Sequence, residues 1–184
     1  MLSRGRAAIL AYVLAALGFC PAAVEAQASK YEEIPYLPTP EWVVDEMLRI
    51  AKVTKDDVVY DLGCGDGRIV TTAARKFGAR GVGIDLRADL IKHANYNAQR
   101  AGVANRVRFV QGDVFDVDLR PATVVTLFLL PVVNEGLQPK LLKELQPGSR
   151  IVSHAFPMGD WKPDEFLEKN GRKIYLWIVP ERKK

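Results

Sequence analysis

The chain has 184 residues, of which 48% are hydrophobic and 26% are charged, the balance of an ordinary globular domain. This length and composition exclude a small fold that depends on a metal or on disulfides, and Cys20 and Cys64 form no Cys/His pattern of a metal site. The formal net charge of +4 comes from scattered basic residues without interleaved aromatic residues, so we expect no nucleic-acid partner.

The first 28 residues have the pattern of a targeting segment. Arg4 and Arg6 precede an apolar run over residues 7–19, which Pro21 ends, and small residues follow. The run has the length of a secretory signal and is short for a membrane span. We therefore expect residues 1–28 to be a signal peptide or an N-terminal membrane anchor, and the protein to be exported to the periplasm or held at a membrane. Residues 29–38 follow as a linker.

Helical and strand-like segments alternate along the rest of the chain, and residues 39–184 are expected to form one domain. Thr39 is expected to cap the first helix, with Pro40 at its first position. Asn170-Gly171, between two apolar runs, is the strongest short signal of a β-hairpin. The expected elements, in chain order, are a helix from residue 39 to about 52, strand 58–60, helix 69–77, strand 81–85, helix 88–101, strand 107–110, an apolar strand within 123–130, helix 134–145, strand 150–153, and hairpin strands at 166–167 and 173–179.

Strands that alternate with helices and are apolar throughout indicate a parallel sheet covered on both faces. The closing hairpin adds two antiparallel strands at one end of that sheet. The expected fold class is therefore α/β: a doubly wound, mostly parallel, Rossmann-like sheet of seven strands with a C-terminal antiparallel hairpin.

A glycine-rich loop, Asp61-Leu62-Gly63-Cys64-Gly65-Asp66-Gly67, follows the first strand, at the edge where parallel sheets bind ligands. Glycines let the backbone turn and approach a ligand, and the next helix offers free N–H groups that suit a carboxylate. The third glycine stands one place earlier than in the dinucleotide fingerprint, and Asp61 would repel a pyrophosphate but attract an ammonium group. The loop therefore predicts contacts to a cofactor that carries an amino acid, made by Asp61, Gly63, Cys64, Gly65 and Gly67.

Two further acidic residues stand where later strands end. Asp85 ends the second strand, 24 residues after Asp61, where a carboxylate can hydrogen-bond both hydroxyls of a ribose. Asp113 follows the third strand, where a carboxylate can face an adenine amino group, and the neighbours Leu86 and Val114 are assigned to the same site. Taken singly, Asp61 could be a helix cap and Asp85 a loop residue, but the ordered set predicts a nucleoside-containing cofactor.

Residues 61–67 resemble motif I of class I S-adenosylmethionine-dependent methyltransferases, and Gly83-Ile84-Asp85 resembles their next motif. A narrower resemblance is to a small family of protein-lysine methyltransferases, whose mitochondrial members modify the ATP synthase c subunit and the adenine nucleotide translocase. It is carried by residues 36–40, 60–68, 122–127 and 147–154. The resemblance implies S-adenosylmethionine as cofactor, no metal, and a lysine-bearing protein substrate, membrane proteins included. This cofactor is made and used inside cells, which disagrees with the export signal.

The acceptor is expected beside residues 130–134, because many methyltransferases hold the acceptor nitrogen after the fourth strand. Asn134 and Pro131 are the candidate catalytic residues, since the Asn134 amide or the carbonyl of Leu130 or Pro131 could orient an amine. The alternative is a plain strand end with Asn134 as the helix N-cap. Tyr36 is a candidate for a lid, and His154 is expected to be packed and hydrogen-bonded rather than in contact with substrate.

The leading function is a protein-lysine N-methyltransferase that transfers a methyl group in line to a deprotonated lysine amine. Burial in an apolar channel lowers the pKa of a lysine, so no dedicated base is required. One alternative is a small-molecule or O-methyltransferase, which would need a closed pocket. Another is a non-catalytic exported nucleoside-binding protein. A nucleotide-dependent oxidoreductase is disfavoured by Asp61 and by the early third glycine.

Overall fold

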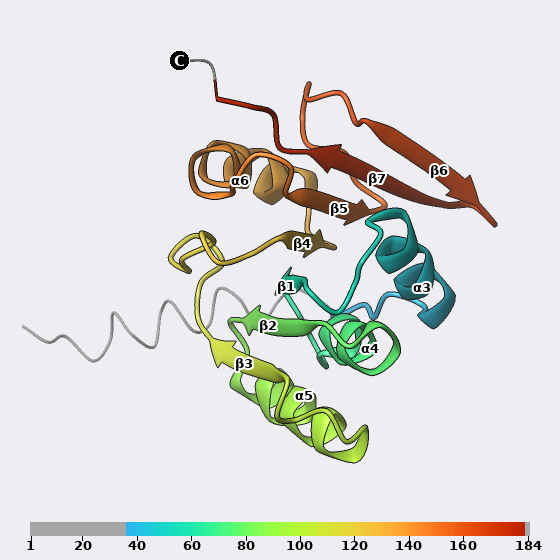
Figure 1. Cartoon of the computed structure of the whole chain (residues 1–184), viewed down its shortest axis with the longest axis vertical. Helices are drawn as coiled ribbons and strands as arrows, with labels where there is room; N and C mark the ends of the chain where they lie inside the picture. Colours follow the sequence, from blue (N-terminus) through green and yellow to red (C-terminus); the bar gives the residue numbers. More distant parts are fainter. Residues whose placement is uncertain (1–35, 183–184) are drawn as a thin grey trace, which may run out of the picture. The chain divides into compact units, whose positions relative to one another are not determined.

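The structure, a computed structural model, describes residues 36–182 (Figure 1). The predicted targeting segment, residues 1–28, and the first part of the linker lie outside the described residues. The elements are α3 (Glu41–Ile50), β1 (Val58–Leu62), α4 (Arg68–Phe77), β2 (Arg80–Asp85), α5 (Ala88–Arg100), β3 (Val107–Gln111), β4 (Val124–Leu127), α6 (Pro131–Glu144), β5 (Arg150–His154), β6 (Glu165–Lys169) and β7 (Arg172–Ile178).

All seven of these strands join one sheet in the order β3-β2-β1-β4-β5-β7-β6. The first five are parallel to one another, and β7 is antiparallel to both β5 and β6. Figure 1 shows the β6–β7 hairpin at one end of the sheet and β3 with α5 at the other. The predicted α/β fold with a C-terminal antiparallel hairpin is confirmed.

Alternate residues along the central strands face two different layers of helices. On one face, Leu137 and Leu141 of α6 pack with β-strand residues such as Tyr60 and Val125. On the other face, α3 and α4 pack against residues such as Val59. This alternation follows from the period-two geometry of a strand, and it explains why these strands are apolar at nearly every position.

Glycine and asparagine end two elements where the sequence predicts. Gly78 follows α4 with φ +72°, and its N–H donates to the carbonyl of Ala74. Asn170 and Gly171 connect β6 to β7 with φ +50° and +70°. Both central residues of a type I′ turn need positive φ, which is why this pair favours a tight hairpin.

Two helix starts differ from the prediction. Thr39 does not cap α3: Pro40 occupies the N-cap position, no side chain caps the helix, and the Thr39 hydroxyl lies 3.3 Å from Nδ1 of His154. Helix α6 begins at Pro131 rather than at Asn134, so Asn134 is not its N-cap. The fixed φ of proline suits the first helical turn and keeps Leu130 out of the helical region, so α6 begins at Pro131. The strand formed by the apolar run ends earlier, at Leu127.

Within residues 36–182, no helix combines the length and the apolar character that crossing a membrane requires.

Candidate active site

The glycine loop between β1 and α4 is held in shape by its own backbone. The N–H groups of Gly63 and Cys64 both donate to the carbonyl of Ile84 at 2.9 Å, and the N–H of Gly65 donates to Oδ2 of Asp85 at 2.9 Å. These three amides are therefore engaged within the protein. The free N–H groups that the sequence analysis expected belong instead to the start of α4, where the N–H of Arg68 donates to Oδ1 of Asp66 at 3.2 Å. The positive φ of the three glycines, +80°, +53° and +74°, allows this tight path along β2 (Gly63, Gly65 and Gly67).

Side chains from other parts of the chain lie directly on the loop. A Cβ at Gly65 would stand 2.4 Å from Cε2 of Tyr36, and a Cβ at Gly63 would stand 2.6 Å from Cδ2 of Leu129. The loop therefore has no room for side chains at these two positions. Cys64 is buried against Gly83, and burial raises the pKa of its thiol, so it is a packing residue and not a nucleophile.

Asp61 is a buried carboxylate with one hydrogen-bond donor beside it. It lies inside β1, 2% exposed, and accepts a 2.7 Å hydrogen bond from the hydroxyl of Thr126 on β4. Burial raises its pKa to about 7, and the negative charges of Asp85 and Asp66 act in the same direction. Such a group is costly to ionise alone, and an ammonium group placed against it would favour the charged form. The chemistry of Asp61 thus fits the amino group of S-adenosylmethionine.

Asp85 and Asp113 lie at the ends of the neighbouring strands β2 and β3. Asp85 accepts hydrogen bonds from the N–H of Gly65 and, at 3.0 Å, from that of Arg87, and these bonds orient its carboxylate. A carboxylate has about four acceptor sites, so two remain for ribose hydroxyls. Asp113 accepts a 2.9 Å bond from the N–H of Phe115 and is half-buried. Together with Asp61, these residues place three carboxylates along three adjacent strands.

The two apolar residues assigned to the cofactor site flank these carboxylates. Leu86 is half-buried, and its carbonyl accepts a 3.1 Å hydrogen bond from the side chain of Gln111. Val114 is buried and packs into the core. The structure places both beside the expected cofactor residues.

Residues 36–40 run across the glycine loop and are fastened to it. Arg68 holds Asp66 through two hydrogen bonds, of 2.9 and 2.7 Å, and donates a third, of 2.9 Å, to the carbonyl of Thr39. Tyr36 lies on Gly65, and burial together with the Asp66 carboxylate raises the pKa of its phenol to about 12. Tyr36 therefore forms part of the wall of the site.

The candidate catalytic residues on α6 have different surroundings. Pro131 is exposed at the start of the helix, whereas Asn134 is fully buried. The Asn134 amide nitrogen lies within 3.3–3.4 Å of three oxygens, the Ser153 hydroxyl and the carbonyls of Phe156 and Pro157. Asn134 thus links the first turn of α6 to the segment that follows β5.

An aromatic cluster, unrecognised in the sequence, lines the edge after β4 and β5. The rings of Phe128 and Phe156 stack at 6.3 Å, and the His154 ring lies 4.1 Å from Phe128. His154 is buried, as expected, and its pKa is lowered to about 4 by burial and by the positive charge of Arg172. No sequence signal joins these rings, because their strands become neighbours only in the folded sheet.

Comparisons with known proteins agree with the predicted resemblance to methyltransferases. A family model described as the ANTKMT methyltransferase domain matches residues 61–165. A protein-lysine N-methyltransferase of Saccharolobus islandicus is 49% identical, over 82% of this chain and 96% of its own length. A mouse adenine nucleotide translocase lysine N-methyltransferase is 37% identical over 80% of this chain, and a Xenopus laevis lysine N-methyltransferase of the ATP synthase c subunit is 31% identical over 78%. The chain spans slightly under two thirds of the length of these two animal relatives.

Solved structures show the same fold with a cofactor product bound. A crystal structure described as an RNA methyltransferase from Salinibacter ruber with S-adenosyl-L-homocysteine has a TM-score of 0.79 and 54% identity, over 80% of this chain and 97% of that one. A methyltransferase from Geobacter sulfurreducens, also with S-adenosyl-L-homocysteine, has a TM-score of 0.57 and 28% identity, over 69% of this chain and 52% of that one. The chain therefore belongs to the ANTKMT methyltransferase family and is an S-adenosylmethionine-dependent methyltransferase of class I.

Proposed function

We propose that this enzyme is a protein-lysine N-methyltransferase. The observation that carries the proposal is the relative from Saccharolobus islandicus with that name, which this chain matches at 49% identity over nearly that protein's whole length. The two animal relatives are also named for lysine methylation.

The charge beside the acceptor edge favours an ammonium-bearing substrate over RNA. Glu135, in the first turns of α6, and Asp160, after β5, are both exposed. Two carboxylates here attract a lysine and repel nucleic-acid phosphates. This matters because the Salinibacter ruber neighbour is described as an RNA methyltransferase.

S-adenosylmethionine, when bound, supplies an activated methyl group on its sulfonium. On this proposal Asp61 holds the amino group of the cofactor, Asp85 its ribose hydroxyls and Asp113 its adenine amino group. Leu86 and Val114 pack beside it, and the loop glycines let the backbone approach it.

The protein has then to present a neutral lysine amine. His154 is a poor base at neutral pH, since its pKa is about 4 and its Nδ1 lies beside the Thr39 hydroxyl. The half-buried rings of Phe128 and Phe156 offer apolar surroundings at the acceptor edge. Such surroundings lower the pKa of an amine, so the lysine proton can leave to solvent before methyl transfer. Lowering the pKa by one unit makes the charged amine about 1.4 kcal/mol less favourable relative to the neutral one. Asn134 acts on the same step by fixing the segment that carries Phe156.

A further part of the proposal is that the acceptor lysine lies in an apolar protein surface, such as that of a membrane protein. Five of the eight exposed large hydrophobic residues of the described chain stand around the carboxyl edge of the sheet (Tyr36, Leu37, Phe115, Leu130 and Val132). Apolar side chains gathered on a surface are typical of contact sites. Labelling of both soluble and membrane fractions of the native host should place most of the methyl label in membrane proteins, and label confined to soluble proteins would contradict this part.

Transfer of a tritiated methyl group from S-adenosylmethionine tests the acceptor. The purified enzyme is incubated separately with protein and with RNA from its host, and labelled protein is hydrolysed to identify methyl-lysine. We expect label in protein as methyl-lysine, lost in Asp85→Ala. Label in RNA and none in protein would refute the proposal.

We also propose that residues 1–28 act as a cleaved signal or a membrane anchor. Mass spectrometry of the protein from its native host should find either a chain that starts after Ala26 or Ala28, or an intact chain in the membrane fraction. An intact chain in the soluble fraction would contradict this.

A further inference from the structure

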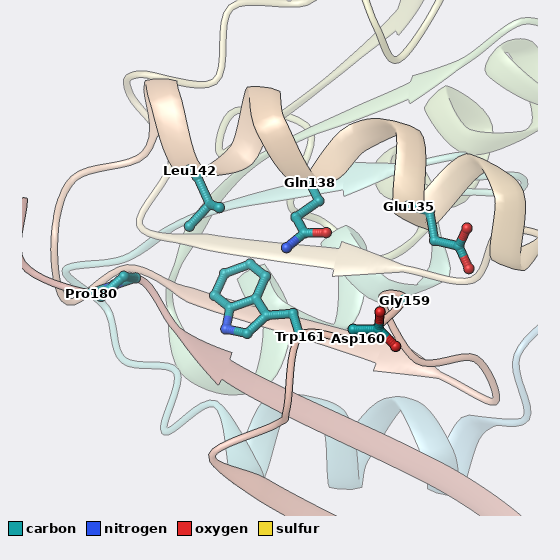
Figure 2. A pocket seen from close by; sticks show the side chains of 7 residues that line it. All are labelled: Glu135, Gln138, Leu142, Gly159, Asp160, Trp161 and Pro180. Atoms are coloured by element: carbon teal, nitrogen blue, oxygen red, sulfur yellow. The ribbon is translucent and has the colours of Figure 1, made fainter.

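A groove of about 560 Å³ runs along α6 (Figure 2). Helix α6 forms one wall, and the segment between β5 and β6 forms the other. It is lined by Glu135, Gln138, Leu142, Gly159, Asp160, Trp161 and Pro180. Figure 2 shows the Trp161 ring in the middle of the groove, facing Gln138 and Leu142.

Trp161 is fixed in position before any ligand arrives. Its carbonyl accepts a 2.8 Å hydrogen bond from the indole N–H of the fully buried Trp177, and the two ring systems lie 6.1 Å apart. A backbone bridge to Met158 holds the same segment from the other side. These bonds fix the backbone of residue 161, and the half-buried indole itself packs against the core beside the Trp177 ring. The ring therefore loses little conformational freedom when a ligand covers its open face, as an interface anchor does.

The Glu135 end of the groove lies near the start of α6, at the carboxyl edge of the sheet. Glu135 follows Asn134, whose amide reaches the carbonyl of Pro157, and a Cβ at Gly159 would stand 3.2 Å from Cγ of Glu135. Asp160 comes next, so this end carries two carboxylates. Leu142 and Pro180 mark the other end, which is apolar (Figure 2).

We propose that this groove binds the segment of the acceptor protein that adjoins the methylated lysine. The occupant is an extended chain with an apolar side chain over Trp161 and a basic side chain against Glu135 and Asp160. This inference rests on the proposed lysine methyltransferase function, and it adds where and by what chemistry the acceptor is recognised.

Position and charge select this occupant. An acceptor whose lysine enters beside the start of α6 lies next to Glu135, and from there the groove offers a path along α6. The acidic end complements the basic residues of such a segment, whereas it disfavours a phosphate-bearing ligand. The volume is that of a site for several side chains.

Steady-state methylation of lysine peptides tests the inference. A library of peptides with a central lysine and varied flanks first identifies a good substrate for the full-length enzyme. That peptide and a version truncated to the lysine and its nearest neighbours are then compared in four variants. Trp161→Ala and Glu135→Lys alter the groove. Phe166→Ala and Asp56→Lys are the matched controls, since they also replace an aromatic residue by alanine and an acid by lysine, at exposed positions elsewhere.

We expect both groove variants to raise KM for the long peptide roughly tenfold or more, the size typical of losing an anchor residue, with kcat unchanged. KM for the truncated peptide should match the unmutated enzyme in Trp161→Ala, whose ring contacts only the flanking segment. The Kd for S-adenosylmethionine should match it in both groove variants, and the controls should change nothing. Glu135→Lys leaves no cavity, so it separates loss of binding from loss of folding. Unchanged KM values for the long peptide in both groove variants would overturn the inference while lysine methylation stands. An unmutated enzyme that methylates none of the peptides would instead contradict the proposed function.

Discussion

Asp61→Asn should stabilise the protein in the absence of cofactor while weakening cofactor binding. The carboxyl of Asp61 is 2% exposed, and its pKa is raised from 3.8 to about 7. Asparagine has the same shape and keeps the oxygen that accepts the hydroxyl of Thr126, but it has no charge to bury. The substitution therefore removes the pH-dependent cost of an unpaired buried carboxylate. Its amide N–H groups, like the O–H of the protonated acid, add a cost that does not change with pH.

The magnitude follows from the raised pKa of Asp61. Below about pH 4 the Asp61 carboxyl is protonated in both the folded and the unfolded chain, so its burial does not lower the free energy of unfolding. From pH 4 to 7 the unfolded chain releases the proton and the folded chain keeps it, so the unmutated protein loses stability as pH rises. Above pH 7 the loss is complete, about 4 kcal/mol, against roughly 2 kcal/mol at pH 5. For a chain of this size, 4 kcal/mol corresponds to about 8–16 °C in Tm.

Thermal unfolding of both proteins at pH 5 and pH 8 measures this directly, because other ionisable groups cancel in the difference. The variant should unfold at the higher temperature, with the larger gap at pH 8. Binding of S-adenosylmethionine is measured by calorimetric titration. For the unmutated protein, Kd should rise as the pH falls below 7, by up to tenfold for each pH unit. For the variant, Kd should be high and independent of pH. A gap in Tm that is equal at both pH values, or a variant less stable at pH 8, would refute the reasoning.

Two other predictions concern the segment that crosses the loop. Gly65→Ala should lower the free energy of unfolding by more than Gly102→Ala does. Both positions have positive φ, but only at Gly65 would the new Cβ meet a ring, that of Tyr36 at 2.4 Å. Equal losses of unfolding free energy in urea would contradict that contact. Thr39→Val should cost about 1–3 kcal/mol by leaving the buried Nδ1 of His154 without a partner, and Thr39→Ser should restore most of it. Unfolding free energies that are the same for the valine and serine variants would argue against the hydrogen bond.

Local signals predicted much of the fold and the place of three acidic residues along one edge of the sheet. The Asn170-Gly171 turn and the end of α4 at Gly78 depend on backbone conformations that few residues adopt, so the sequence identifies them directly. Asp61, Asp85 and Asp113 could be predicted together because parallel strands end at one edge, which converts spacing in sequence into proximity.

Contacts between distant segments could not be predicted in the same way. Thr39 has the pattern of a helix cap, yet its hydroxyl lies beside His154, 115 residues away, in a contact that only the packed sheet creates. Asparagine is also a common N-cap residue, but α6 already begins at Pro131. Asn134 therefore lies within the first turn of the helix, and its side chain is buried. The groove at Trp161 depends on how α6 lies against the segment after β5, which no local pattern specifies.

On the proposed function, the carboxylates of the two halves of the site have opposite tasks. Asp61 is buried, so its charge becomes favourable only when the ammonium group of the cofactor lies against it. Glu135 and Asp160 are exposed, so they attract a lysine ammonium through water, but they cannot hold it during transfer because the reacting amine has to be neutral. The amine therefore has to leave these acids for the apolar surroundings of Phe128 and Phe156. An arginine would be attracted by the same carboxylates, yet its guanidinium keeps its proton even in apolar surroundings. A site that relies on such surroundings rather than on a base therefore favours lysine over arginine.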